Sequence, residues 1–313
     1  LFITLYRVIN AGTRITSTRI YTEEANLQNT HKLFRSYLTD RQFVVKFKNI
    51  ISNSRNFSAG VPQGSILGPF LYILYTADMP TNNHIHTSTF ADDTAFLSVH
   101  KDPKIASHNL QSHIYILEKW LSKWKIKVNP SKCAQVTFTL RRGNCPNVTI
   151  NNTHVPEQTH IKYLGIHLDR RLTWSQHIES KSTHLKLKTV QLLWLLNSNS
   201  ALKLDYKVLL YKAIIKPIWT YGIQLWGTAS SSNVEKLQRR QSKILRLITG
   251  SPWFIRNENI HKDLNIPTVR DEIKKFCSTY VQKLSTHPNP LAQDLLLYRG
   301  HSRVKRSLAI AET

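Results

Sequence analysis

Acidic residues are scarce in this sequence. Its 313 residues include 43 Lys and Arg against 19 Asp and Glu, which gives a net charge of +24. Such an excess excludes an ordinary metabolic enzyme with a balanced surface and predicts a polyanionic partner, with nucleic acid as the first candidate. A membrane surface is the weaker alternative, because the basic residues are spread along the chain rather than gathered in one polybasic segment.

Cysteine and long apolar runs are also rare. Cys133, Cys145 and Cys277 follow no metal-binding spacing, so we expect reduced intracellular thiols. The 14 His show no ligand spacing with Cys or acids, and we predict no zinc site. No apolar stretch reaches the roughly 18 residues of a membrane span. Because the sequence starts at Leu1 rather than Met, we expect a fragment.

The pair Asp92-Asp93 is the most informative feature present. Two short apolar arms, 88–91 and 94–97, meet at these adjacent carboxylates, which predicts a β-hairpin with the pair at its turn. Two carboxylates at one tip repel each other unless a cation lies between them, so the tip is a candidate Mg²⁺ site for phosphoryl transfer. A solvated turn that happens to hold two Asp is the alternative.

A Gly- and Pro-rich loop, residues 59–69, precedes the pair by about 30 residues. It leads into an apolar segment, 70–74, that we expect to be helical. Ser65 is a candidate N-cap, and Gly64 would let the backbone approach a ligand closely.

The loop, helix and Asp hairpin, in this order, resemble the palm of a reverse transcriptase. Three further strings are similar to the Jockey-type branch of non-LTR retrotransposons: Leu38-Thr39-Asp40-Arg41-Gln42-Phe43, Tyr75-Thr76-Ala77-Asp78-Met79-Pro80 and Phe90-Ala91-Asp92-Asp93-Thr94-Ala95. The resemblance covers roughly residues 31 to 285. It implies an RNA-directed DNA polymerase that uses Mg²⁺, with Mn²⁺ as an alternative, on an RNA template, a DNA primer and dNTPs. It also implies nuclear action. We expect no membrane partner, and the sequence gives no evidence for an obligate protein partner.

We expect an α+β fold: a partial polymerase palm with an antiparallel sheet and packed helices, followed by an all-helical thumb-like region. The expected divisions are a divergent segment (1–30) in place of the fingers and first palm strand, the palm (31–170), the thumb-like region (171–285) and a basic tail (286–313). Residues 1–30 show no clear period. A strand is expected at 43–47, a long helix starting after the N-cap Asp102, and strands or turns at 134–140, 148–150 and 161–168. Further helices are expected at 175–199, 203–218, 231–249 and 267–285, with the seven Trp treated as core residues.

The resemblance also implies roles for single residues. Asp92 and Asp93 are the expected catalytic and metal-binding residues. Residues expected to bind the nucleotide or template are Gln63, Gly64, Ser65 and Lys132; those expected to grip the primer end are Tyr163, Leu164 and Gly165. Each role has an alternative. The loop around Gln63, Gly64 and Ser65 could be purely structural, Lys132 could be an ordinary surface lysine, and the turn at 163–165 could be a simple hairpin with a glycine.

A basic stripe marks the helix expected at 231–249. Its members recur at three- to four-residue spacing opposite an apolar face, which suits contact with a nucleic-acid backbone rather than a merely solvated face. They are Lys236, Arg239, Arg240, Lys243 and Arg246.

One expected element is not found. The resemblance implies a third metal-binding carboxylate on a strand upstream of the loop, yet the acids before Gly60 are Glu23, Glu24 and Asp40, none in an apolar strand. Three hypotheses therefore stand: an active polymerase, a truncated remnant that binds RNA or DNA through charge, and an unstable fragment whose palm lacks a central strand.

Overall fold

The computed structural model describes residues 2–9, 26–57, 60–61 and 64–297. The chain divides into two compact units between residues 158 and 159, with Phe138–Leu140 joining the second unit. The hairpin at 160–169 therefore belongs to the helical unit, whereas the sequence predicts a division near 170. Within the described ranges, no helix is both long and apolar enough to cross a membrane.

A five-stranded antiparallel sheet forms the centre of the first unit. Its order is β6-β7-β1-β8, and β9 also pairs with β1. The strands are β1 (Phe2–Ile9), β6 (Ile85–Phe90), β7 (Asp93–Ser98), β8 (Ile126–Val128) and β9 (Ala134–Val136). The sheet thus carries the Asp92-Asp93 turn between two of its neighbouring strands.

Strand β1 corrects one expectation. We found no period in the first 30 residues and considered a palm without its central strand, but β1 lies between β7 on one side and β8 and β9 on the other. Its sequence, FITLYRVI, is a short and nearly continuous apolar run without clear polar–apolar alternation, so periodicity did not identify it as a strand. The hypothesis of a sheet with a missing centre is therefore wrong.

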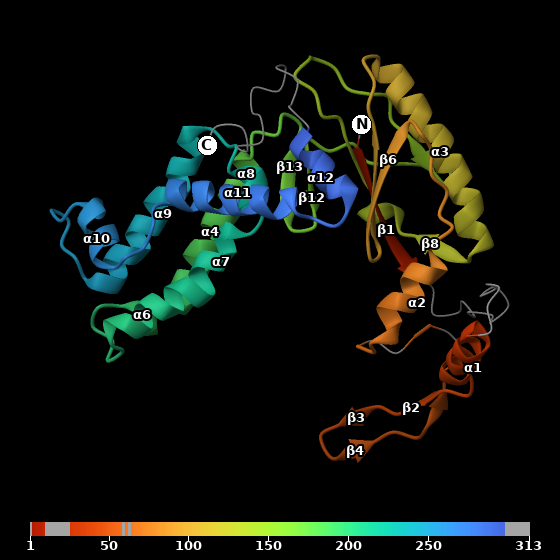
Figure 1. Cartoon of the computed structure of the whole chain (residues 1–313), viewed down its shortest axis with the longest axis horizontal. Coiled ribbons are helices and arrows are strands. Elements are labelled where there is room, and N and C mark those ends of the chain that lie inside the picture. The colour runs from red at the N-terminus through yellow and green to blue at the C-terminus, as the bar shows by residue number, and fades with distance from the viewer. Residues whose placement is uncertain (1, 10–25, 58–59, 62–63, 298–313) are drawn as a thin grey trace. The chain divides into compact units, whose positions relative to one another are not determined.

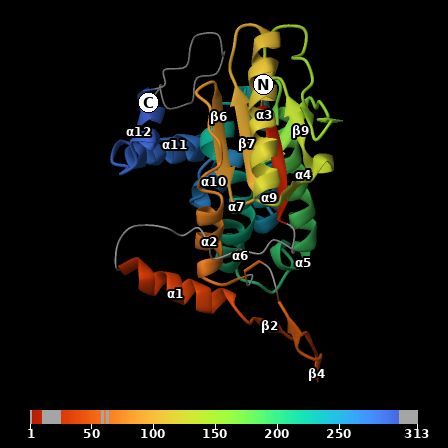
Figure 2. The same ribbon diagram turned by 90° about the vertical axis from the view of Figure 1, so that its right-hand side faces the viewer.

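Helix α3 (Pro103–Lys123) covers one face of this sheet (Figure 2). It begins as predicted, because the Asp102 side chain accepts a 2.8 Å hydrogen bond from the Lys104 N–H and Pro103 occupies the first turn. Its apolar face packs against β7 and β8, and this core includes the fully buried Phe96, Leu110 and Ile114. The short pair β10 (Thr149–Ile150) and β11 (Thr153–His154) packs along the same helix through β10.

Between β1 and the Asp hairpin, the chain forms helix α1 (Asn26–Leu38), a narrow β arm and helix α2 (Leu67–Tyr75). The single strand expected at 43–47 is wrong: two short ladders replace it. They pair β2 (Gln42–Phe43) with β5 (Arg55–Asn56), and β3 (Lys46–Phe47) with β4 (Ile50–Ile51). The arm's strand residues are all exposed, so no core packing holds them in one continuous ladder.

The second unit is a hairpin followed by helices (Figure 1). The hairpin pairs β12 (His160–Tyr163) with β13 (Ile166–Asp169). The helices are α4 (Ser175–Gln191), α5 (Leu193–Leu196), α6 (Leu204–Leu210), the π-helical turn η3 (Tyr211–Ile215), α7 (Lys216–Thr220), α8 (Ile223–Trp226), α9 (Ser231–Thr249), α10 (Asn257–Asp263), α11 (Val269–Ser285) and α12 (Pro290–Leu297). The four predicted helical stretches are confirmed, although the first ends at Leu196.

The tryptophans divide into buried and exposed groups. Trp219 and Trp226 lie in the core of the second unit. Trp194 and Trp253, by contrast, are 73% and 87% exposed, so treating all seven as core residues was wrong. Trp253 has no helix around it, because it lies in the loop between α9 and α10.

Candidate active site and nucleic-acid-binding surfaces

The Asp pair occupies the tip of the β6–β7 hairpin, as predicted. Phe90 pairs with Asp93, which leaves Ala91 and Asp92 as a two-residue turn. Ala91 has a φ of +50°, the left-handed conformation that tight hairpin turns require. Asp92 is exposed and Asp93 is half-buried, so the two carboxylates start from different environments.

The charges around Asp93 are not balanced. Its pKa is raised above the ordinary value, first by burial and then by the negative charge of Asp92, while the positive charge of Lys132 opposes the shift. Lys132 ends the short helix η2 (Pro130–Lys132), which follows β8. The fold thus brings Lys132 into the electrostatic range of the Asp pair, where the sequence had suggested a basic residue. A cation placed at the tip would favour the charged form of Asp93, against both its burial and the repulsion from Asp92.

Within the described ranges, no third His, Cys, Asp or Glu joins the pair as a metal ligand. The β1 residue that pairs with Asp93 is Tyr6, and β1 contains no acidic residue. Asp40 lies in the turn after α1 with a φ of +51°. Glu23 and Glu24 lie outside the described residues. Mg²⁺ is commonly held by one or two carboxylates together with waters and substrate phosphates. The two Asp therefore fit this ion, but they lack the third carboxylate that the resemblance implies.

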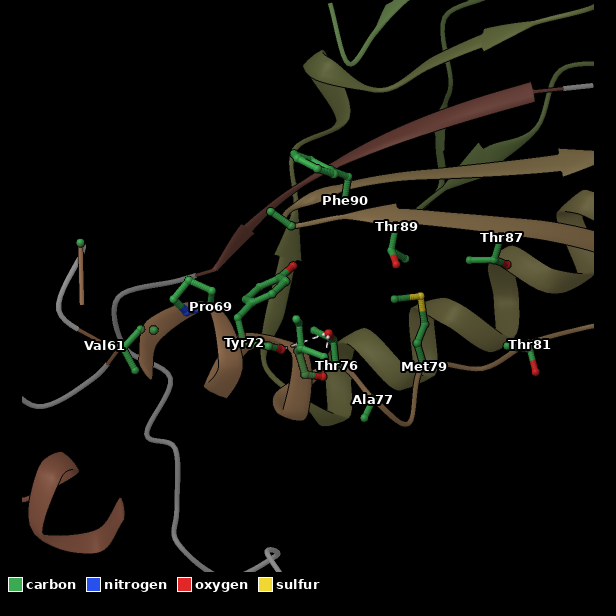
Figure 3. Close-up of a pocket in the computed structure, with 14 residues that line it drawn as sticks. Val61, Pro69, Tyr72, Thr76, Ala77, Met79, Thr81, Thr87, Thr89 and Phe90 are labelled. Carbon is green, nitrogen blue, oxygen red and sulfur yellow. Dashed lines mark hydrogen bonds between the residues drawn. The ribbon is translucent and has the colours of Figure 1, made fainter. Parts of the chain in front are cut away.

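A pocket of about 920 Å³ adjoins the turn (Figure 3). One wall is α2 and the segment after it, which contribute Tyr72, Thr76 and Met79; the other is β6, with Thr87 and Thr89, and the pocket reaches Ala91 next to Asp92. Its lining is mostly apolar with a few hydroxyls, a composition typical of ligand sites.

The C-terminal end of α2 is fixed to α3 below this pocket. Asp78 accepts hydrogen bonds from the indole N–H groups of Trp120 and Trp124, at 3.0 and 3.2 Å. The Tyr75 hydroxyl donates a further bond to the Trp124 carbonyl oxygen. The Tyr75–Pro80 string of the sequence therefore positions the pocket wall.

The structure describes two of the three residues of the loop before α2 that are expected at the template, Gly64 and Ser65. The N-cap of α2 is Ile66 rather than Ser65, but the Ser65 hydroxyl still accepts a 3.1 Å bond from the Gly68 N–H in the first turn of the helix. Gly64 lines the pocket with a φ of +83°, and a Cβ added there would meet no atom within 4 Å. Gln63 lies outside the described residues.

The turn expected to grip the primer lies in the second unit. Leu164 and Gly165 connect β12 and β13 with φ values of +46° and +77°. Tyr221 holds this turn: its hydroxyl donates a 2.8 Å bond to the Leu164 carbonyl oxygen, and its ring lies 3.2 Å from where a Gly165 Cβ would be.

A cation accompanies the turn. The Lys181 Nζ lies 5.2 Å from the centre of the Tyr221 ring, and burial, assisted by Lys162, lowers the pKa of Lys181. Sequence reasoning missed both Lys181 and Tyr221. The Tyr221-Gly222 pair gave a weak turn signal, but no spacing linked it to residue 164.

The basic stripe lies on α9, and its members differ in their surroundings. Lys236, Arg239 and Lys243 are exposed, and Arg239 forms a loose 3.9 Å ion pair with Glu235. The Arg240 Nε donates a 3.4 Å bond to the Ser182 hydroxyl. The Arg246 guanidinium donates hydrogen bonds to backbone carbonyls of the loop after α9. Lys236, Arg239 and Lys243 are therefore the members of the stripe that are exposed to solvent.

Comparison with known proteins gives the class. Residues 16–168 match the family described as reverse transcriptase (RNA-dependent DNA polymerase), and this stretch includes the Asp hairpin, the α2 loop and Lys132. The chain therefore carries a reverse transcriptase domain.

Similarity to whole proteins extends beyond this domain. The chain is 43% identical over 279 residues to a probable RNA-directed DNA polymerase from transposon X-element of Drosophila melanogaster, covering 88% of this chain and 31% of that protein. RNA-directed DNA polymerases from mobile element jockey are 38% identical in D. melanogaster, over 83% of this chain and 29% of theirs, and 37% identical in D. funebris, over 88% and 31%. The chain is thus similar to RNA-directed DNA polymerases of transposons and mobile elements, and it spans about a third of the length of these relatives.

Proposed function

We propose that this chain is the palm and thumb of a reverse transcriptase that adds dNTPs to a DNA 3′-hydroxyl on an RNA template. The sheet unit would be the palm and the helical unit the thumb. The observation that carries the proposal is the Asp92-Asp93 tip, which lies within the electrostatic range of Lys132 and next to the 920 Å³ pocket. Such an element would act at chromosomal DNA, hence in the nucleus.

The residues of the tip have separate tasks. Asp92 and Asp93 offer adjacent carboxylate oxygens for divalent ions. When bound, two Mg²⁺ ions would lower the pKa of the primer hydroxyl and neutralise the triphosphate. Lys132 would bind the triphosphate, since an ammonium group is a point cation suited to phosphate oxygens.

The nucleic acid would be held by features of both units. Gly64 and Ser65 would contact the template from the loop, together with Gln63. The Tyr163-Leu164-Gly165 turn would hold the primer end, and Lys236, Arg239 and Lys243 would contact backbone phosphates. The fixed turn geometry favours this role, because a preorganised turn loses little entropy when it binds.

The test is primer extension on a primed RNA template with Mg²⁺ and dNTPs, comparing the wild-type chain with Asp92→Asn and Asp93→Asn. Each variant should lose extension while its unfolding transition is retained. Asp263→Asn, an exposed acid on α10, is the matched control and should extend normally. Undiminished extension by Asp92→Asn would contradict the assignment.

A second function has its own support. The absence of an acid from β1, with no third ligand in the described ranges, favours a chain that grips nucleic acid without polymerising. That chain would show no extension, yet its affinity for a primer–template duplex would fall by roughly 10³-fold between low and moderate salt if it makes six or more phosphate contacts. Absence of cooperative unfolding would instead favour an unstable fragment.

A further inference from the structure

The loop between α9 and α10 presents two aromatic side chains to solvent. Trp253 is 87% exposed and Phe254 is 65% exposed. Their ring centres are 6.1 Å apart, and the planes meet at 81°. Exposed apolar rings are unfavourable in water, and adjacent exposed rings form a contiguous apolar surface of the kind found at interaction sites.

This loop is held in shape by one side chain. The Arg246 guanidinium donates hydrogen bonds to the carbonyl oxygens of Ser251, at 3.5 Å, of Pro252, and of Ile255, at 2.8 Å, and a fourth to the Asn257 Oδ1, also at 2.8 Å. Helix α9 stops immediately before the loop, at Gly250 with a φ of +66°. The backbone that carries the two rings is therefore fixed before any ligand arrives, which lowers the entropy lost on binding.

The charge around the rings selects the kind of ligand. From the start of α9 to the end of α10, residues 231–263 hold seven Lys and Arg against three Asp and Glu. Lys243, Arg256 and Lys262 are exposed. An apolar platform in cationic surroundings suits a polyanion that also carries flat apolar groups, which describes a single-stranded nucleic acid with unpaired bases.

We propose that the loop 251–256 is a stacking site for an unpaired nucleobase, with Trp253 as the platform and the neighbouring cations on the flanking phosphates. Perpendicular rings cannot both stack on one base, and Trp253 is the more exposed ring. The Phe254 ring braces the indole. This site lies outside the Asp tip, the loop before α2 and the turn at 163–165, and its occupation does not require polymerisation.

Three oligonucleotides separate base stacking from charge: oligo(U), oligo(dT) and an abasic strand of equal length, each with a fluorescent label. Anisotropy titrations of the full chain should show tighter binding to oligo(U) or oligo(dT) than to the abasic strand. Trp253→Ala should lose roughly 10-fold or more in affinity for the base-containing strands and little for the abasic one. The relative loss on oligo(U) and oligo(dT) tells whether RNA or DNA is the preferred source of the base.

Matched variants make the result decisive. Trp194→Ala removes another exposed tryptophan, on α5 of the same unit, and should leave all three affinities unchanged. Trp253→Phe should recover most of the loss, because an aromatic face remains. Equal binding of base-containing strands by the wild type and Trp253→Ala would overturn the proposal and point to a protein surface as the occupant. An equal loss on the abasic strand would also overturn it, since a backbone contact would then explain the effect. Both readouts are independent of the extension assay, so a failure here is distinguishable from a failure of the proposed function.

Discussion

The Tyr221 hydroxyl donates a 2.8 Å hydrogen bond to the Leu164 carbonyl oxygen, 57 residues earlier in the chain. A helical connection thus holds the turn of a β-hairpin from outside the hairpin. The order of the turn at 163–165 therefore depends on packing within the helical unit as well as on its own backbone.

Tyr221→Phe tests this dependence, because it removes the hydrogen bond and keeps the ring beside Gly165. We expect the free energy of unfolding to fall by about 0.5 kcal/mol, the lower end for one hydrogen bond, because this bond is exposed to solvent. Urea unfolding measures this change. In primer extension, KM for the primer–template should rise more than kcat falls, since the chemistry lies at the Asp tip. If the free energy of unfolding falls as expected but KM is unchanged, the turn does not take part in primer binding.

The pH dependence of stability follows from His177. Burial, with the positive charge of Lys181 and then His167 acting in the same direction, lowers the pKa of His177 to about 4. Below about pH 6.5 the unfolded chain takes up a proton at this residue and the folded chain does not. The free energy of unfolding should therefore decrease as the pH falls from about 6.5 to about 4, by on the order of 3 kcal/mol.

Urea unfolding at several pH values measures this slope. His177→Asn keeps an acceptor for the 3.3 Å bond from the His167 N–H and should flatten the slope. His184→Asn, on the exposed side of the same helix, should leave the slope unchanged. The same slope in His177→Asn as in the wild type would assign the effect to another group.

The Tyr6→Asp variant tests the incomplete ligand set. Position 6 is opposite Asp93 in the β1–β7 register, and directly opposed positions of an antiparallel pair share a face of the sheet. A carboxylate introduced there would be a third oxygen ligand, so affinity for a divalent cation should increase, by roughly 10-fold. Electron paramagnetic resonance of Mn²⁺ measures this directly. Thr4→Asp, opposite Ala95 and farther from the tip, is the control and should gain much less.

Lys216, whose side chain is 24% exposed, forms an ion pair with the buried Glu272, with the Nζ 2.5 Å from the Oε1. Lys216→Met should destabilise the helical unit by about 3 kcal/mol or more, because Glu272 is then left buried without its partner. The double variant Lys216→Met/Glu272→Leu should recover most of that loss. Thermal unfolding of both variants, with Glu272→Leu alone, completes the cycle. A double variant no more stable than Lys216→Met would contradict this account.

Local patterns predicted much of this fold. The Asp hairpin, the capped start of α3 and the amphipathic α9 each follow from residues close together in the sequence, and the structure confirms all three. Strand β1 was missed because its sequence is a short apolar run without the alternation that reveals a half-buried strand. The bonds of Arg246 were missed because their acceptors are backbone carbonyls, which no side-chain pattern marks.

Candidate residues followed the same rule. Lys132 could be proposed from its motif, but its proximity to Asp93 is set by the path of β8 and η2 beside the sheet. Tyr221 and Lys181 meet the 163–165 turn only through tertiary packing, so their contribution required the structure.

The π-helical turn at Tyr211–Ile215 joins α6 to α7 without breaking the helix. A turn of this kind accommodates one residue more than an α-helical turn, and each residue rotates a helix by about 100°. It therefore sets the rotational phase between Lys207, whose Nζ caps the carbonyl of Asn197, and Lys216, whose Nζ meets Glu272. Deleting one residue from this turn would leave the composition of the core nearly intact but would rotate α7 relative to α6. Lys207 and Lys216 could then no longer both reach their partners.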